Sequence, residues 1–327
     1  MDHNRDTVIV MGARGWVGRQ VCDWLHRNGQ RVVGFGRNAA AGPWTHFVVG
    51  DLSARRGLPV ELHRELGRAI AVVHCAGRAH QPRENTDDRS VFHEVNVAGT
   101  MRVIDACRAA GVSRLVYTST IAGYDWSQIC GKAAGEDAPQ RPATIYAQSK
   151  LDGEGLVSGS GLDWRVARLA TVFGSGDPAN FATLARALKR GRFVLPGEGD
   201  ARKSVLPVRF AAEVLGHLAL TEIMPERCFN VALPEAPSLA EICHTFCLEC
   251  NFRPPRALPQ GILRMGARFG DAIAKAGIGF PLTTTSLGKL VGSTVVDARR
   301  LYRALAHLQP PSLSEAVRES AEFYRGL

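Results

Sequence analysis

Two side chains four residues apart, Tyr146 and Lys150, offer proton-transfer chemistry. They lie in YAQSK, at the start of a predicted helix from Tyr146 to Leu156, so both side chains share one helical face. A tyrosine hydroxyl at its ordinary pKa of about 10 is a slow acid or base at neutral pH, and a neighbouring ammonium favours the phenolate. The spacing predicts a pair that can move a proton, although the same spacing also occurs by chance.

A glycine-rich turn near the start of the chain predicts a binding site for a dinucleotide. The apolar strand TVIVM runs directly into Gly12-Ala-Arg-Gly15-Trp16-Val-Gly18, which opens a predicted helix from Trp16 to Asn28. Gly12 permits the tight turn, Gly15 lets the backbone approach a pyrophosphate, and Gly18 allows helix and strand to pack closely. Amides at the helix N-terminus then face the phosphates.

Taken together, these motifs resemble the extended short-chain dehydrogenase/reductase family of the NAD-dependent epimerase/dehydratase type. The glycines have the family's GxxGxxG spacing, NVAGT (96–100) matches its helix motif, and the resemblance covers nearly the whole chain. It implies an enzyme that uses NAD or NADP, with Asp51 contacting adenine and Lys150 also holding the nicotinamide ribose. The remaining cofactor contacts that we expect from the resemblance are Trp16, Leu52, Cys75, Ala76, Gly77, Asn96 and Tyr146.

The resemblance also supplies a hydroxyl partner for the tyrosine. Aligning YTSTIAGY with the family pattern places Thr120 on the catalytic serine or threonine, with Ser119 just before it as a substrate contact. Thr120 would donate a hydrogen bond to the substrate oxygen as charge develops there. The alternative is that Ser119 and Thr120 only cap the end of a strand.

The end of the second predicted strand bears on the choice of cofactor. A carboxylate there normally accepts hydrogen bonds from the adenosine ribose, but this chain has Arg37 in GFGRN. A guanidinium can pair with a 2′-phosphate, which favours NADP(H) over NAD(H) and leaves NAD possible. The alternative is a solvated loop arginine.

The residues after Thr120 narrow the reaction. Family dehydratases carry an Asp-Glu pair there, and this chain has Ile121-Ala122, so ketone reduction, alcohol oxidation or epimerisation through a transient ketone remain. The pattern is closest to bacterial nucleotide-sugar 4-ketoreductases and epimerases. That likeness places Asn180 and the basic pair Arg202 and Lys203 on the substrate diphosphate.

Two departures weaken the predicted sugar site: Arg209 replaces a family aspartate, and the usual Pro-Pro is absent from ARLATVFG. A reductase of a non-sugar carbonyl would share the cofactor features and would need no diphosphate site. A non-catalytic NADP-sensing regulator is a third class, and an intact set of Thr120, Tyr146 and Lys150 argues against it.

The elements that position these residues alternate between β-branched runs and helical patterns, the rhythm of a Rossmann-type α/β fold with a doubly wound parallel sheet. We expect this cofactor-binding domain over residues 1–174, with segments near 204–232 returning to it. Residues 175–203 and 233–327 should form a smaller, mainly helical substrate lobe. Predicted helices include 91–110, 181–190 and one capped by Ser238.

Composition excludes several classes. The 327 residues are 45% apolar and 22% charged, as in soluble globular proteins and unlike disordered chains. The net charge is +9, but dispersed arginines without interleaved aromatics argue against nucleic-acid binding. We find no membrane span and no signal-peptide pattern, so we expect a cytoplasmic protein, and a homodimer is a candidate assembly.

The cysteines and the segment 263–278 allow two further predictions, one on thiol state and metal binding and one on a surface helix. Eight scattered cysteines indicate reduced thiols, and we expect no metal, since Cys243, Cys247 and Cys250 fall on one helical face. In segment 263–278, Arg264, Arg268, Asp271 and Lys275 also share a face, which predicts an amphipathic surface helix. The alternatives for this helix are a lid over the substrate or a membrane-surface contact.

Overall fold

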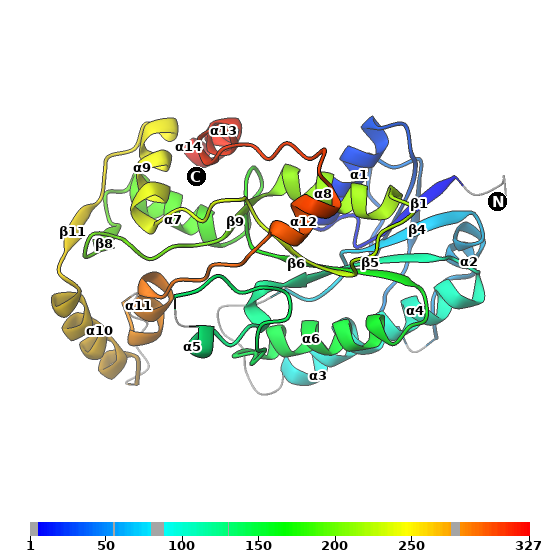
Figure 1. Ribbon diagram of the computed structural model, residues 1–327, viewed down its shortest axis with the longest axis horizontal. Helices are drawn as coiled ribbons and strands as arrows, with labels where there is room; N and C mark the ends of the chain where they lie inside the picture. The colour runs from blue at the N-terminus through cyan, green and yellow to red at the C-terminus, as the bar shows by residue number, and fades with distance from the viewer. Residues whose placement is uncertain (1–5, 55, 80–87, 130, 276–281) are drawn as a thin grey trace.

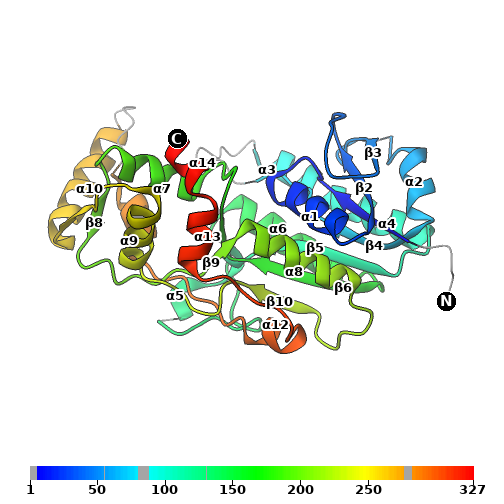
Figure 2. The same cartoon turned by 90° about the horizontal axis from the view of Figure 1, so that it is seen from above.

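One parallel sheet organises the molecule (Figures 1 and 2). The computed structural model describes residues 6–54, 56–79, 88–129, 131–275 and 282–327. Seven strands pair in the order β10-β6-β5-β4-β1-β2-β3, and every pair is parallel. Their bounds are β1 (Thr7–Met11), β2 (Arg31–Gly36), β3 (His46–Val49), β4 (Ala69–His74), β5 (Arg114–Thr120), β6 (Asp163–Leu169) and β10 (Cys228–Val231). The predicted Rossmann-type fold is confirmed.

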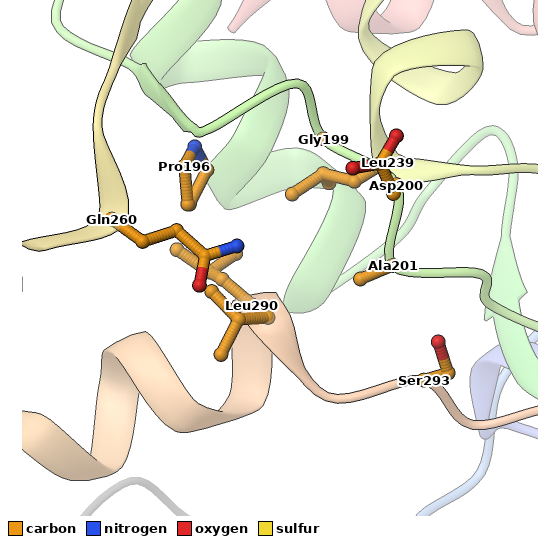
Figure 3. A pocket seen from close by; sticks show the side chains of 9 residues that line it. Pro196, Gly199, Asp200, Ala201, Leu239, Gln260, Leu290 and Ser293 are labelled. Atoms are coloured by element: carbon orange, nitrogen blue, oxygen red, sulfur yellow. The ribbon is translucent and has the colours of Figure 1, made fainter. Parts of the chain in front are cut away.

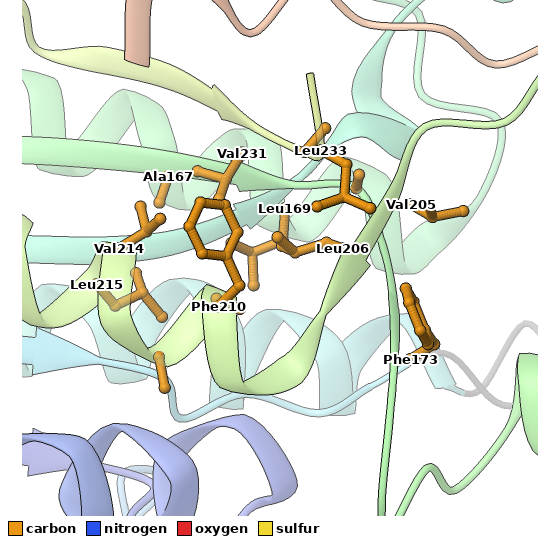
Figure 4. Packing of buried hydrophobic residues seen from close by; sticks show 14 of the residues in the cluster. Ala167, Leu169, Phe173, Val205, Leu206, Phe210, Val214, Leu215, Val231 and Leu233 are labelled. Carbon is orange, nitrogen blue, oxygen red and sulfur yellow. The ribbon is translucent and has the colours of Figure 1, made fainter. Parts of the chain in front are cut away.

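The central strands are apolar because helices cover both faces of the sheet. Alternate residues of β1 enter two separate cores, with Val8 and Val10 on one side and Ile9 and Met11 on the other. Figure 4 shows the first core, where Phe210 packs against strand residues such as Val231. Helices α1 (Trp16–Arg27) and α8 (Val208–Leu220) cover this face, and α2 (Val60–Leu66), α4 (Gly99–Ala109) and α6 (Ile145–Ser158) cover the other.

The predicted helix from 91 to 110 is confirmed in extent but not in its hydrogen bonding. It consists of α3 (Asp88–Phe92), a π-helix (His93–Ala98) and α4. A π-helix has wider turns than an α-helix and commonly occurs at functional sites. Here it contains the buried side chain of Asn96.

Beyond the sheet, the chain builds the opposite end of the molecule, to the left in Figure 1. Two small parallel pairs lie here, β7 (Thr171–Phe173) with β9 (Val205–Pro207) and β8 (Val194–Pro196) with β11 (Arg256–Leu258). The helices are α7 (Asn180–Lys189), α9 (Leu239–Cys250), α10 (Gln260–Lys275), α11 (Thr284–Val291), α13 (Leu313–Glu319) and α14 (Ala321–Gly326). Short elements complete the chain: a 3-10 turn (Ile121–Gly123), α5 (Trp126–Ile129) and α12 (Arg299–Ala304), which contacts β10.

Local signals explain where these helices begin. Ser238 caps α9, as predicted: its hydroxyl accepts a hydrogen bond from the Glu241 amide, and the Glu241 carboxylate accepts one from the Ser238 amide. Cys243, Cys247 and Cys250 are buried in the core beside α9, and their thiols are free. No helix among the described residues is long and apolar enough to cross a membrane.

Candidate functional site

The strand order reverses between β1 and β4, so the carboxyl ends of these two strands border the crevice where ligands bind in such sheets. Gly12 follows β1 with a φ of +78°, and a Cβ added there would lie 2.7 Å from the Ala76 backbone nitrogen. A Cβ on Gly18 would collide with the Gly12 carbonyl. Glycines are therefore needed at both positions, for the turn and for close packing, as predicted.

The N-terminus of α1 is open toward this crevice. Gly15 is its N-cap, no side chain caps it, and its first turn holds no acidic residue. The first-turn amides and the helix dipole thus favour an anion at this point. A twelve-residue helix with this entry is suited to the pyrophosphate of a dinucleotide.

Asn96 joins the end of β4 to α6. Its side-chain oxygen accepts from the Arg78 amide at 2.7 Å, and its nitrogen donates to Ser149 Oγ at 2.8 Å. A Cβ added to Gly77 would lie 3.1 Å from the Asn96 oxygen and 3.8 Å from Lys150 Nζ. The structure therefore brings Gly77, Asn96 and Lys150 together, with Cys75 and Ala76 on the same β4 end.

Helix α6 holds the predicted catalytic pair. Thr144 fixes its start by accepting a hydrogen bond from the Ala147 amide at 3.1 Å. Lys150 is buried, its ammonium lies 4.1 Å from the centroid of the Tyr117 ring, and desolvation lowers its pKa to about 8. Burial also raises the pKa of Tyr146 to about 12, so the hydroxyl keeps its proton at neutral pH. At neutral pH the pair therefore consists of a protonated phenol and an ammonium.

The two hydroxyl residues at the end of β5 differ. Thr120 is half-buried, and its Oγ1 accepts from the Ala122 amide at 3.2 Å, so it caps the 3-10 turn that follows β5. Its proton remains available to another acceptor. Ser119 Oγ is buried and has no hydrogen-bond partner within the described residues. A buried hydroxyl without a partner is a place where a ligand atom is accommodated well.

At the predicted adenosine end, Arg37 is exposed just past β2. Asp51 accepts hydrogen bonds from the Ser53 amide and hydroxyl at 2.9 and 2.8 Å, which hold its pKa low, with a smaller contribution from Arg37. Leu52 is buried beneath this turn. The sequence analysis overlooked Arg14, whose guanidinium donates to the Asn38 carbonyl at 3.4 Å. The position of Arg14 within the glycine turn was the sequence signal that could have identified it as a residue near the cofactor.

Trp16 connects the glycine turn to the predicted substrate segment. Its indole nitrogen donates to the Ser175 carbonyl at 2.7 Å, and a Cβ on Gly176 would lie 3.3 Å from the indole. The same segment leads to Asn180, the exposed first residue of α7. Asp177, which accepts from two amides of this turn at 2.8 and 2.9 Å, positions the start of α7.

Arg202 and Lys203, the cations predicted to bind the substrate diphosphate, donate hydrogen bonds to backbone carbonyls in the structure. Arg202 donates to the Ala236 carbonyl at 2.8 Å. Lys203 donates to the Lys289 carbonyl at 2.8 Å and to the Gly292 carbonyl, which satisfies the C-terminus of α11. Burial lowers the pKa of Lys203 to about 8. Arg209, which replaces the family aspartate, forms an ion pair with Glu319.

A cavity of about 190 Å³ lies beside these cations (Figure 3). Its walls come from β8, the turn after it, and the ends of three helices: Pro196, Gly199, Asp200, Ala201, Leu239, Gln260, Leu290, Val291 and Ser293. The Arg202 amide donates to Ser293 Oγ at 3.0 Å, which places the backbone of Arg202 at the border of the cavity. Pockets for whole ligands measure about 300–1,000 Å³, so this one suits only part of a larger molecule.

Comparison with known proteins agrees with this geometry. The sequence profile of the NAD dependent epimerase/dehydratase family matches residues 8–232. The chain belongs to this family. It is an NAD(P)-dependent enzyme of the extended short-chain dehydrogenase class.

Relatives of this epimerase/dehydratase family member differ in the reactions their names describe. It is 29% identical over 225 residues to sterol-4-alpha-carboxylate 3-dehydrogenase, decarboxylating, from Homo sapiens, which covers 65% of this chain but 57% of that relative. It is 23% identical to UDP-glucose 4-epimerase from Vibrio cholerae, over 97% of this chain and 95% of the relative. The structure of MoeE5 in complex with UDP-glucuronic acid and NAD has a TM-score of 0.74 at 23% identity and covers 98% of this chain and 99% of that one.

In this family member, a buried ion pair that the sequence analysis overlooked supports the catalytic helix. Arg168 on β6 binds Glu154 on α6 at 2.6 Å and donates to the Tyr124 hydroxyl at 2.9 Å. Tyr124 in turn donates to Asn230 at 2.7 Å. Glu154 lies one turn after Lys150 and helps to keep that ammonium charged. The four-residue spacing of Lys150 and Glu154 was the signal for this network.

Proposed function

We propose that the chain transfers a hydride between a nicotinamide dinucleotide and the keto or hydroxyl group of a nucleotide sugar, with Tyr146 as acid and base. The observation that carries this proposal is the pairing of the half-buried Tyr146 with the buried Lys150 on one helix, with Lys150 next to Gly77 and Asn96 at the carboxyl edge of the sheet. The open N-terminus of α1 and the glycine turn suit the dinucleotide pyrophosphate.

Each side chain then has a separate task. The dinucleotide, when bound, supplies or accepts the hydride. Tyr146 donates its proton to the substrate oxygen during reduction and takes it back during oxidation. The Lys150 ammonium stabilises the phenolate that forms and orients the nicotinamide ribose. Thr120 donates a hydrogen bond to the same substrate oxygen, which lowers the cost of charge there.

An epimerase is the second candidate, and one observation favours it. UDP-glucose 4-epimerase aligns over 97% of this chain, whereas the sterol dehydrogenase, which would represent a non-sugar carbonyl substrate, aligns over 65%. An epimerase reuses its dinucleotide within one cycle, and a reductase consumes one for each turnover. The same residues perform the proton transfer in both reactions.

Purified enzyme distinguishes the candidates. We would incubate it separately with UDP-glucose, UDP-N-acetylglucosamine and a UDP-4-keto sugar, with NADPH or NADH. Loss of absorbance at the reduced nicotinamide band, in proportion to 4-hydroxy product, indicates a reductase. A C4 epimer formed without net loss of cofactor, measured by NMR, indicates an epimerase. Turnover of only non-sugar ketones would contradict the nucleotide-sugar proposal.

We also propose that the enzyme prefers NADP(H), because three guanidiniums border the loop after β2. Arg37 lies in this loop, Arg14 donates to the Asn38 carbonyl, and Arg19 donates to the Ala41 carbonyl at 3.2 Å. A 2′-phosphate there would gain charged hydrogen bonds, which are stronger than neutral ones. NADH offers only a hydroxyl at the same position.

The substrate diphosphate, the assembly and the location complete the proposal. Asn180 would contact the diphosphate, so Asn180→Ala should raise the KM for the nucleotide sugar and leave cofactor affinity unchanged.

We propose a cytoplasmic enzyme, since the seven cysteines of the described residues are free. We propose a homodimer, which sedimentation velocity would test directly.

A further inference from the structure

Helix α10 has an apolar side that stays exposed among the described residues. Leu263 and Ala267 face inward and pack with Leu287 of α11 in a small core of their own. Ile262, Met265 and Phe269 are 52%, 70% and 66% exposed. Their spacing of three and four residues places them on one stripe of the helix. A surface helix ordinarily carries polar residues on its exposed side, so an exposed apolar stripe indicates an interaction site.

Helix α10 also lies at an extremity of the molecule. Figures 1 and 2 both place it at the end remote from α2, and Figure 1 shows α11 beside it. The central sheet and the helices that cover it lie away from this end of the molecule. Leu258 on β11, which is also exposed, extends the apolar surface beyond the helix start.

Positive charge borders the stripe. Arg264 and Arg268 are exposed on the adjoining face of α10. Arg253 and Arg256 precede the helix and are exposed as well. Residues 251–291 contain six Lys and Arg residues and one acidic residue, Asp271. That carboxylate is engaged, because it accepts hydrogen bonds from the Thr284 amide at 3.1 Å and hydroxyl at 2.6 Å.

We propose that the Ile262–Met265–Phe269 stripe docks on an anionic phospholipid surface, with the bordering arginines on lipid phosphates. An apolar stripe flanked by basic side chains is the pattern of helices that lie in the membrane interface. A second copy of the chain fits less well, because a two-fold interface through α10 sets the same arginines against each other. Docking would hold the Pro196–Ser293 cavity, whose wall includes Gln260 at the start of α10, beside the membrane.

Vesicle flotation tests the proposal without reference to catalysis. The full chain would be mixed with vesicles of phosphatidylcholine alone or with one third phosphatidylglycerol. We expect binding only to the anionic vesicles, and weaker binding at high salt. Met265→Ser with Phe269→Ser should lower the partition coefficient at least about a hundredfold, from about tenfold for each side chain. Arg264→Gln with Arg268→Gln should lower it roughly twentyfold.

Matched controls lie elsewhere on the surface. Ile223→Ser removes an apolar side chain that is 88% exposed, and Arg64→Gln with Arg68→Gln removes two exposed charges near α2; neither should change binding. Circular dichroism and turnover confirm that each variant folds. Equal binding to neutral vesicles, binding that survives the serine pair, or self-association that the serine pair abolishes without any vesicle binding would each overturn the proposal. Because the readout is binding, failure of the proposed reaction leaves this result unaffected.

Discussion

The dinucleotide end and the substrate end of the crevice differ in how their predicted residues are used. At the dinucleotide end, residues from β1, β4, the π-helix and α6 meet within van der Waals distance, as Gly12 with Ala76 and Gly77 with Asn96 show. At the substrate end, Arg202 and Lys203 donate to backbone carbonyls of their own lobe. The first set converges at the edge of the sheet, whereas the two cations of the second are engaged by carbonyls of their own lobe.

This difference reflects what fixes each region. A parallel sheet brings the carboxyl ends of its strands to one edge, so residues that follow strands converge whatever loops connect them. The substrate end is built from two short strand pairs and helix ends, and no repeating geometry specifies its side-chain partners. The position of a residue in the first region therefore follows from the sheet, whereas the position of one in the second depends on contacts between distant segments.

Removing the Tyr146 hydroxyl should give the largest effect. Tyr146→Phe should lower turnover at least about a hundredfold, because the acid and base group is lost, with cofactor affinity nearly unchanged. Steady-state rates and fluorescence titration with NADPH measure the two quantities. Tyr302→Phe is the matched control, since that hydroxyl donates to the Ala232 carbonyl away from the catalytic helix. Comparable turnover in Tyr146→Phe would remove it from the mechanism.

The pH profile distinguishes the buried Lys150 from the half-buried Lys203. Lys150 is charged below its pKa of about 8 and loses its charge above, while Tyr146, with a pKa near 12, stays protonated throughout. Ketone reduction should be constant below pH 8 and fall roughly tenfold per pH unit above it. Lys150→Arg should move the fall of its residual rate upward. Lys203 has the same pKa of about 8, so Lys203→Met must leave the fall in place.

Much of the fold and of the dinucleotide site was predictable from sequence, for physical reasons. Apolar β-branched runs and glycine turns are local signals, and they identified the strands, α1 and the Ser238 cap. The π-helix was not predicted, because its hydrogen-bond shift leaves the apolar pattern of the surrounding helix intact. The partners of Lys203 were not predictable either: the carbonyl of Lys289 lies 86 residues further along the chain.

Replacing Arg37 tests which dinucleotide the predicted dinucleotide end prefers. If it binds the 2′-phosphate, the wild type should prefer NADPH over NADH about ten- to a hundredfold, since charged hydrogen bonds contribute roughly 1.5–3 kcal/mol. Arg37→Ala should remove most of this preference, and high salt should reduce it. Fluorescence titration measures both affinities, with the exposed Arg303→Ala as control. Equal wild-type affinities would make Arg37 a loop charge.

Lys203 is the direct test of the substrate end. If it serves the C-terminus of α11, Lys203→Met should lower the free energy of unfolding by about 1–3 kcal/mol and change the KM for the nucleotide sugar less than threefold. Thermal unfolding and steady-state kinetics measure these. Lys189→Met, which removes a similar bond to the Arg325 carbonyl, is the control for stability. A tenfold rise in KM at unchanged stability would instead assign Lys203 to the diphosphate.

Trp16 joins the two ends, and replacing it should give the smallest effect. Trp16→Phe keeps an aromatic ring near Gly176 but removes the hydrogen bond from the indole nitrogen to the Ser175 carbonyl. One neutral hydrogen bond contributes about 1 kcal/mol, so the KM for the nucleotide sugar should rise about fivefold while NADPH affinity changes less than twofold. Turnover should stay near the wild-type value, because no reacting group is lost. Trp164→Phe on β6 is the control. If NADPH affinity fell and KM did not, Trp16 would belong to the dinucleotide end alone, and the segment from Ser175 to Asn180 would be held by other contacts.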